Sequence, residues 1–194
     1  MREKILINAS DLFITYGFKS VTMDDIANKL GISKKTIYQH FENKTKLVEA
    51  TTLYMFGIIS QGIDCICELE KNPIEELYDI KNFVMVHLKN EKSSPQYQLQ
   101  KYYPKIFKTL KSKQFEVMQS CVTTNLNRGV TDGIFRENIN IDFISRLYFN
   151  GIVSLKDEEI FPLTNFSMKM LSVMIFSLHE CISANCLPFI GLVH

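Results

Sequence analysis

The chain has 194 residues, of which 46% are hydrophobic and 22% are charged, and its formal net charge is +1. This composition is typical of a soluble globular protein and excludes extensive disorder. The most apolar stretch, 168–178, is shorter than the ~20 residues that a bilayer-spanning helix needs, so we expect no membrane partner. Residues 1–50 carry eight Lys or Arg against six Asp or Glu, whereas the remaining residues carry fourteen against fifteen. A polyanion would therefore be held locally, near the N-terminal end.

The five cysteines are an odd number with no CxxC pair, and charged residues follow Met1 directly, unlike a signal peptide. We therefore expect free thiols and a cytoplasmic location. Cys65 and Cys67 would point to roughly opposite faces of a helix, which argues against a shared metal ion. We expect no metal site and no cofactor.

Apolar residues recur at helical spacing, and no segment alternates in the manner of a strand, which predicts an all-α fold of about nine helices. The first helix covers 5–16 and ends at Gly17. Its apolar stripe consists of Ile5, Ala9, Leu12, Phe13 and Tyr16.

The next two helices have clear starts. Thr22 and Asp25 fit a capping box, and Gly31 ends the helix that they begin. Ser33 then caps a third helix that we expect to reach about Phe41. Two short helices joined by a tight glycine turn have the spacing of a helix-turn-helix.

Caps and prolines also mark the later helices. Asn43 caps a fourth helix that continues past residue 60, and Pro73 begins a helix to about Asn90, before a break at 93–95. Pro104 begins a helix that ends at Gly129.

Residues 129–133 have turn chemistry. Asn140 or Asp142 then opens a helix to Leu155, and the last helix runs from near Asn165 to before Pro188.

Four lysines lie in the first turns of the third and fourth helices: Lys34, Lys35, Lys44 and Lys46. Cations are unfavourable there by roughly 0.3–1 kcal/mol each, because a helix N-terminus is itself partly positive. A DNA phosphate backbone would compensate this repulsion. The third helix could enter a major groove and offer Lys35, Thr36 and Gln39 to base edges. An ordinary solvated helical hairpin would show the same spacing.

Residues 4–50 closely resemble the DNA-binding region of TetR-family regulators. The resemblance implies an all-helical fold of about nine helices, a homodimer and repression that a ligand relieves. It also implies that the residues matching Lys35, Thr36 and Gln39 face bases, and that those matching Thr22, Tyr38, His40 and Lys44 contact phosphates; the helix-start argument adds Lys34 to the phosphate set. The matching string comprises Leu12-Phe13, Gly17-Phe18, Val21–Ala27, Leu30–Lys44 and Leu47.

We accordingly expect a DNA-binding domain at 1–47, joined through the fourth helix to a ligand-binding and dimerisation domain at 48–194. The resemblance suggests that the last two long helices form the dimer interface, although an intramolecular core helix would be equally apolar. The candidate interface residues are Leu147, Gly151, Met170, Met174 and Leu178.

A small-molecule pocket is expected among the helices of 73–125, where aromatic and methionine side chains are frequent. Each of these residues could equally belong to an ordinary core. The absence of a charged cluster favours an apolar or aromatic ligand. The candidates are Phe83, His87, Tyr103, Phe107 and Met118.

The sequence therefore predicts a ligand-responsive regulator, a repressor that binds a palindromic operator in double-stranded DNA as a homodimer and is released by a small molecule. The alternative is a DNA-binding adaptor whose C-terminal part binds a protein. An enzyme is disfavoured, because the sequence contains no HExxH, P-loop or GxGxxG motif and suggests no catalytic residues.

Overall fold

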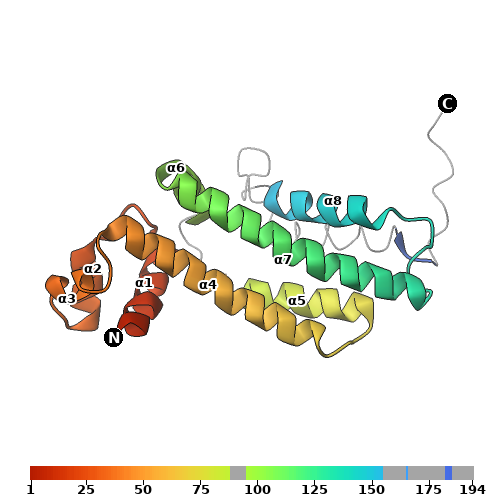
Figure 1. Ribbon diagram of the computed structural model, residues 1–194, viewed down its shortest axis with the longest axis horizontal. Helices are drawn as coiled ribbons and strands as arrows, with labels where there is room; N and C mark the ends of the chain where they lie inside the picture. Colours follow the sequence, from red (N-terminus) through yellow and green to blue (C-terminus); the bar gives the residue numbers. More distant parts are fainter. Residues whose placement is uncertain (88–94, 155–164, 166–181, 185–194) are drawn as a thin grey trace. The chain divides into compact units, whose positions relative to one another are not determined.

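The computed structural model describes residues 1–87, 95–154, 165 and 182–184, and these residues contain helices and no strand (Figure 1). The predicted all-α class is thus confirmed.

The chain divides into two compact units, an N-terminal unit (1–68 and 79–114) and a C-terminal unit (69–78 and 115–194). The functional boundary expected at residue 47 stays a prediction. The helices are α1 (Arg2–Tyr16), α2 (Met23–Leu30), α3 (Lys34–Tyr38), α4 (Lys44–Cys67), α5 (Pro73–His87), α6 (Pro95–Tyr102), α7 (Pro104–Thr131) and α8 (Ile141–Ser154).

In the N-terminal unit, α1, α2 and α3 gather around the beginning of α4 (Figure 1). Their apolar faces form one core, which we call the first cluster. Leu99 of α6 and Ile106 and Leu110 of α7 are buried in the same cluster. The sequence analysis assigned no helix to Pro95–Tyr102, although Pro95 is well suited to a helix start. The side chains of the first cluster with no exposed surface are Ile5, Ala9, Phe13, Ile26, Ile37, Leu47 and Val48.

The third helix is shorter than the sequence predicted. It ends at Tyr38, not near Phe41, and Gln39 follows as its C-cap. The backbone N–H groups of His40 and Phe41 both donate to the carbonyl of Ile37, each at 3.0 Å. This tight turn carries Phe41 into the first cluster, where it is buried, so the helical path cannot continue.

Among the described helices, α4 is long and apolar enough to cross a membrane by length and composition alone, with a mean hydropathy of 1.2 in its most apolar window. This helix is not the stretch predicted from the sequence to be the most apolar, which is 168–178. Core helices of soluble proteins pass the same test, so the finding is weak evidence. The beginning of α4 is part of the first cluster, where Leu47 and Val48 are fully buried.

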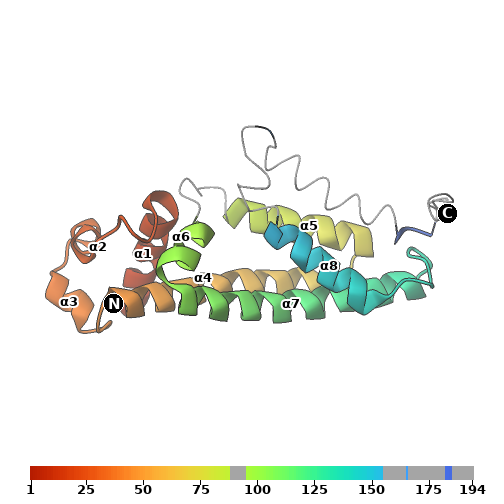
Figure 2. The same cartoon turned by 90° about the horizontal axis from the view of Figure 1, so that it is seen from above.

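The C-terminal unit is built on the second half of α7, with α8 lying along it in both views (Figures 1 and 2). The rings of Phe115 and Phe149 meet edge to face, with centroids 5.2 Å apart. Tyr148 is buried, and this burial raises the pKa of its phenol well above the ordinary value. The core of this unit, the second cluster, comprises Leu77, Val122, Leu126, Phe135, Tyr148 and Ile182.

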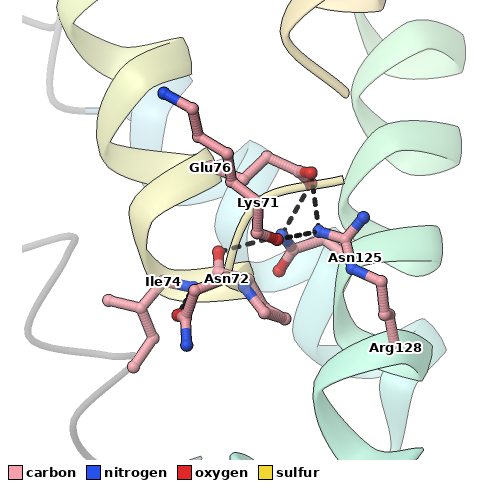
Figure 3. Close-up of polar contacts among 7 residues, drawn as sticks. Lys71, Asn72, Ile74, Glu76, Asn125 and Arg128 are labelled. Atoms are coloured by element: carbon pink, nitrogen blue, oxygen red, sulfur yellow. Dashed lines mark hydrogen bonds and ion pairs between the residues drawn. The ribbon is translucent and has the colours of Figure 1, made fainter. Parts of the chain in front are cut away.

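A buried carboxylate joins the start of α5 to α7 (Figure 3). Glu76 is 2% exposed, accepts a hydrogen bond from Arg128 Nη2 at 2.6 Å and another from Asn125 Nδ2 at 2.8 Å. Arg128 also donates to the carbonyl of Lys71, and the Glu76 carboxylate raises the pKa of the guanidinium. A buried charge that is paired and hydrogen-bonded on both oxygens avoids most of its desolvation penalty. The network therefore fixes where α5 begins relative to α7 within this unit.

The end of α7 also differs from the prediction. The sequence placed a turn at 129–133, whereas the helix continues through Gly129 to Thr131. The N–H groups of Ile134 and Phe135 both donate to the Gly129 carbonyl, and Gly133 takes a left-handed conformation with φ of 69°. The buried Phe135 ring lies directly over Gly129, where a Cβ would come within 2.2 Å of it. Close packing against Phe135 therefore accounts for this glycine, and the chain turns only after it, at Gly133.

The predicted last helix, 165 to before Pro188, lies mostly outside the described residues. At its far end Ser183 instead forms an antiparallel bridge with Phe135, and Ala184 donates to the carbonyl of Ile134 at 2.8 Å. A helix therefore does not extend through Ser183. Ile182 is buried in the second cluster, which explains why this segment lies against the turn that follows α7.

Gly129→Ala should destabilise the protein by about 1–3 kcal/mol, because the new methyl group would overlap the immobile Phe135 ring. The matched control is Gly57→Ala, also within a helix, where nothing lies within 4 Å of the added Cβ. That change should stabilise by up to about 1 kcal/mol through helix propensity. Urea unfolding of both variants checks the contrast, and equal effects would contradict the placement of Phe135.

Candidate nucleic-acid interface

The helix-turn-helix consists of α2, a tight turn and α3. Thr22 caps α2 in a complete capping box: its Oγ1 accepts from the Asp25 N–H at 3.1 Å, and the Asp25 carboxylate accepts from the Thr22 N–H at 2.7 Å. These hydrogen bonds lower the pKa of Asp25. Gly31 ends α2 with φ of 65°, which suits glycine, and Ser33 caps α3 by accepting from the Thr36 N–H.

The orientation of α3 is fixed by one fully buried side chain, Ile37. With Ile37 directed into the first cluster, the opposite side of the helix and its following turn face solvent. Lys35, Tyr38, Gln39 and His40 are all exposed there, and 44% of the Tyr38 side chain is accessible. All four were predicted from the sequence as DNA-contact residues.

The three candidate base-reading residues do not have equal freedom. Lys35 and Gln39 are exposed, whereas Thr36 is half-buried and its hydroxyl lies 2.8 Å from the Ser33 hydroxyl. Gln39 lies just beyond the last helical residue, and its N–H donates to the Lys35 carbonyl. Long, mobile donors at 35 and 39 can reach base edges, while Thr36 offers chiefly its methyl group.

Two of the candidate phosphate-binding residues already have side-chain partners. The Thr22 hydroxyl belongs to the capping box and lies 2.7 Å from an Asp25 oxygen. Lys34 Nζ lies 2.7 Å from Asp24, and this hydrogen bond raises the pKa of the lysine. His40 is exposed beside Tyr38. A phosphate that binds Lys34 would therefore also lie near the Asp24 carboxylate.

Lys44 is the best-supported member of the phosphate set. It lies in the first turn of α4, which Asn43 caps by accepting from the Lys46 N–H. Lys44 Nζ donates to the backbone carbonyl of Lys19 at 3.1 Å. Partial burial lowers the pKa of its ammonium, and the charge of Asp25 opposes this effect. An ammonium has three donors, so this contact leaves capacity for an anion.

Three further cations near this surface were not selected from the sequence as contact residues. Lys19 lies in the α1–α2 loop with its ammonium over the Tyr102 ring, 5.0 Å from the centroid. Arg2 lies over the Phe41 ring at 5.2 Å, and Lys46 pairs with Glu49 at 2.9 Å. Lys46 is among the lysines that helix position singled out in the sequence, whereas the places of the other two depend on tertiary contacts.

The candidate ligand residues whose side chains the structure describes are divided between the two units. Tyr103 and Phe107 pack against the first cluster, where Tyr103 meets Phe18, whereas Met118 packs against the second cluster. Phe83 lies against Gly62 of α4, and the side chain of His87 is outside the described set. The ligand site thus stays a prediction. A surface groove of about 710 Å³ is lined by other residues, namely Phe115, Glu116, Gln119, Ser120, Thr123, Thr124, Asn127, Ile141 and Asp142.

Two of the candidate dimer residues lie on α8. Leu147 is 41% exposed, and Phe143, one turn earlier, is 61% exposed. Gly151, one turn later, is half-buried. Met170, Met174 and Leu178 lie outside the described residues. The exposed apolar pair on α8 is thus where an interface is expected, and Phe143 was not selected from the sequence.

Residues 5–51 match the sequence profile described as "Bacterial regulatory proteins, tetR family". The fold agrees over nearly the whole chain: the structure of a TetR-family regulator from Agrobacterium tumefaciens has a TM-score of 0.72 and 18% identity, covering 94% of this chain and 97% of that one. The chain thus has the fold of TetR-family regulators, and residues 5–51 match the sequence of that family. These matches are transcriptional regulators, and the matched residues 5–51 include the helix-turn-helix of α2 and α3.

Two curated relatives are named as HTH-type transcriptional regulators. The chain is 24% identical over 173 residues to the HTH-type regulator YerO of Bacillus subtilis, covering 82% of this chain and 60% of the relative. It is 35% identical over 63 residues to IcaR of Staphylococcus aureus, covering 32% and 34%. The chain thus spans less than two thirds of either relative. A second TetR-fold structure, titled "Molecular basis for control of antibiotic production by a bacterial hormones", has a TM-score of 0.72, 15% identity and coverage of 94% and 97%.

Asp24→Asn should tighten binding to DNA of any sequence, because it removes a negative charge and the partner of Lys34. If Lys34 then meets a phosphate, the log–log salt slope should steepen by about 0.9. Fluorescence anisotropy with a random-sequence duplex at several salt concentrations measures both effects. Asp11→Asn, which removes an exposed partner of Lys29 and the same charge, is the matched control. Equal changes in the two variants would mean that only net charge matters.

Proposed function

We propose that this TetR-family regulator is a cytoplasmic repressor that binds a palindromic DNA operator as a homodimer and is released by a small molecule. The observation that carries the DNA-binding role is the orientation of α3: Ile37 is fully buried while Lys35, Tyr38, Gln39 and His40 are exposed on the outer side. A short helix held in this way can enter a major groove about 12 Å wide.

The chemistry of the exposed residues supports two kinds of contact. Lys35 and Gln39 carry the donors and acceptors that read base edges, with Thr36 beside them. Tyr38, His40 and Lys44 would hold phosphates and set the register of the helix without reading sequence. Lys34 and Thr22 complete the phosphate set. Each would contact a phosphate while it also keeps its present partner, Asp24 or Asp25. The cations at two neighbouring helix starts thereby acquire a common anionic partner.

Dimerisation is supported by Phe143 and Leu147, which expose an apolar stripe on α8 with Gly151 one turn further on. A second copy that packs on this stripe would bury these side chains and repeat the helix-turn-helix about a two-fold axis. The two recognition helices would then lie about 34–36 Å apart, or a multiple, on a palindromic site. The predicted partners Met170, Met174 and Leu178 would join this interface.

One curated relative supports repression, and one solved structure of similar fold supports a small-molecule ligand. IcaR is named as a negative transcriptional regulator, and the second structure's title refers to control by bacterial hormones. We propose repression relieved by an apolar or aromatic small molecule. Its contacts would come from the candidate residues Phe83, His87, Tyr103, Phe107 and Met118.

Four alanine variants separate phosphate contacts from base contacts, using an operator that the wild-type protein selects from a random library. Lys44→Ala and Tyr38→Ala should weaken binding to the operator and to random DNA alike, and Lys44→Ala should lower the salt slope by about 0.9. Lys35→Ala and Thr36→Ala should instead relax sequence preference by about 1–3 kcal/mol.

Lys108→Ala is the control for these variants, because it removes an exposed lysine of α7, far along the chain from the helix-turn-helix. Its binding should match the wild type. Loss of binding in the control equal to that in Lys44→Ala, or unchanged sequence preference in both base-contact variants, would contradict the assignment of α3.

Leu147→Asp should convert the dimer to a monomer at micromolar concentration, because a carboxylate would be buried in an apolar interface. The residue is exposed in the single chain, so folding should survive. Leu69→Asp, which changes another leucine that is 61% exposed, is the control. Sedimentation velocity distinguishes the two states, and a wild-type protein that is already monomeric would contradict the dimer.

A further inference from the structure

The α6 helix contacts the backbone of the α1–α2 loop through Gln98. The amide of Gln98 lies so close to Gly17 that an added Cβ there would come within 2.2 Å of it. Gly17 has φ of 86°, a conformation that a residue with a side chain rarely adopts. Only glycine, therefore, allows the glutamine to approach the loop backbone this closely. Figure 2 shows α6 beside α1 in the N-terminal unit.

The loop residue Lys19 connects this glutamine to α4 through its two backbone groups. Its N–H donates to Gln98 Oε1 at 3.1 Å, and its carbonyl accepts from Lys44 Nζ at 3.1 Å. The side chain of Lys19 reaches back over the Tyr102 ring of α6, 5.0 Å from the centroid. Both backbone groups and the side chain of one loop residue are thus held between α6 and the start of α4.

The α6 side of this connection is firmly anchored. Leu99, next to the glutamine, is 3% exposed and belongs to the first cluster, and Pro95 at the start of α6 is also buried. The α4 side is also constrained, because Lys44 is partly buried and Asp25 is the charged group facing it. The position of the Lys19 carbonyl therefore decides where the Lys44 ammonium rests.

We propose that Gln98 is a positioning residue for DNA binding: by holding Lys19 it fixes the carbonyl that orients the Lys44 ammonium toward a DNA phosphate. This inference rests on the proposed function, because it takes Lys44 as a phosphate contact. It assigns to α6, which lies outside the helix-turn-helix, a direct part in shaping the phosphate-binding surface. Gln98 itself does not touch DNA in this arrangement.

The first test compares Gln98→Ala with Gln100→Ala, which changes an exposed glutamine of the same helix. Affinity is measured for the library-selected operator and for a random-sequence duplex. Gln98→Ala should weaken both about three- to tenfold, the effect of one hydrogen bond. It should also flatten the salt slope as Lys44→Ala does. Gln98→Glu keeps an acceptor for the Lys19 N–H, so it should bind about as well as Gln100→Glu, which adds the same charge, and Gln100→Ala should match the wild type.

A double-mutant cycle separates positioning from general support of the fold. In a Lys44→Ala background, Gln98→Ala should cost less than about twofold in affinity, because the residue it positions is already gone. In a Tyr38→Ala background it should cost its full three- to tenfold. Thermal unfolding of every variant shows whether the N-terminal unit remains folded at the assay temperature.

The outcomes distinguish a failure of this inference from a failure of the proposed function. If Gln98→Ala acts equally in both backgrounds, or leaves affinity unchanged while Lys44→Ala weakens it, the positioning role is overturned and the DNA-binding role stands. If Lys44→Ala leaves binding to both duplexes unchanged, the positioning role is overturned, because Lys44 then makes no contact with DNA for Gln98 to support. If the wild type binds no member of the library, the proposed function itself fails.

Discussion

The burial of Ile37 is the constraint on which the candidate interface depends. A helix of five residues is too short to be stable on its own, because one or two turns do not offset the cost of nucleation. It persists because Ile37 enters a core that already contains Ile26 and Leu47 without exposed surface. Once Ile37 is fixed, the outward direction of Lys35 and Tyr38 follows from helix geometry. One side of α3 thus packs in the core, and the opposite side carries the residues that would contact DNA.

The caps that start the helices also restrict the groups available to DNA. Thr22 and Ser33 satisfy orphan N–H groups, and the same hydroxyls lie near Asp25 and Thr36. Capping and DNA contact therefore draw on the same atoms. Even Lys44 has a fixed neighbour in a loop carbonyl, so the surface is partly organised before any anion arrives. Preorganised donors lose less side-chain entropy on binding.

Local signals predicted the helix starts well. Thr22, Ser33 and Asn43 act as caps in the structure, and Pro73 and Pro104 begin helices, because capping and proline geometry involve only residues near in sequence. Helix ends were less predictable.

The third helix ends before Phe41 because the Phe41 side chain packs in the first cluster. The α7 helix continues through Gly129, where the Phe135 ring packs against the glycine. The side of α3 that faces solvent could be predicted from the helical spacing of its apolar residues. The Lys19 carbonyl beside Lys44 could not, because its place depends on Gln98, 79 residues away.

The most direct test of the central claim is an amide chemical-shift titration of the labelled protein with its selected operator duplex. We predict the largest changes at Thr22, across Ser33–Lys44 and at Lys19, with small changes along the exposed lysines of α7 from Lys105 to Lys113. Changes concentrated on those α7 lysines, with α3 unaffected, would contradict the account and place DNA on a different face of the protein.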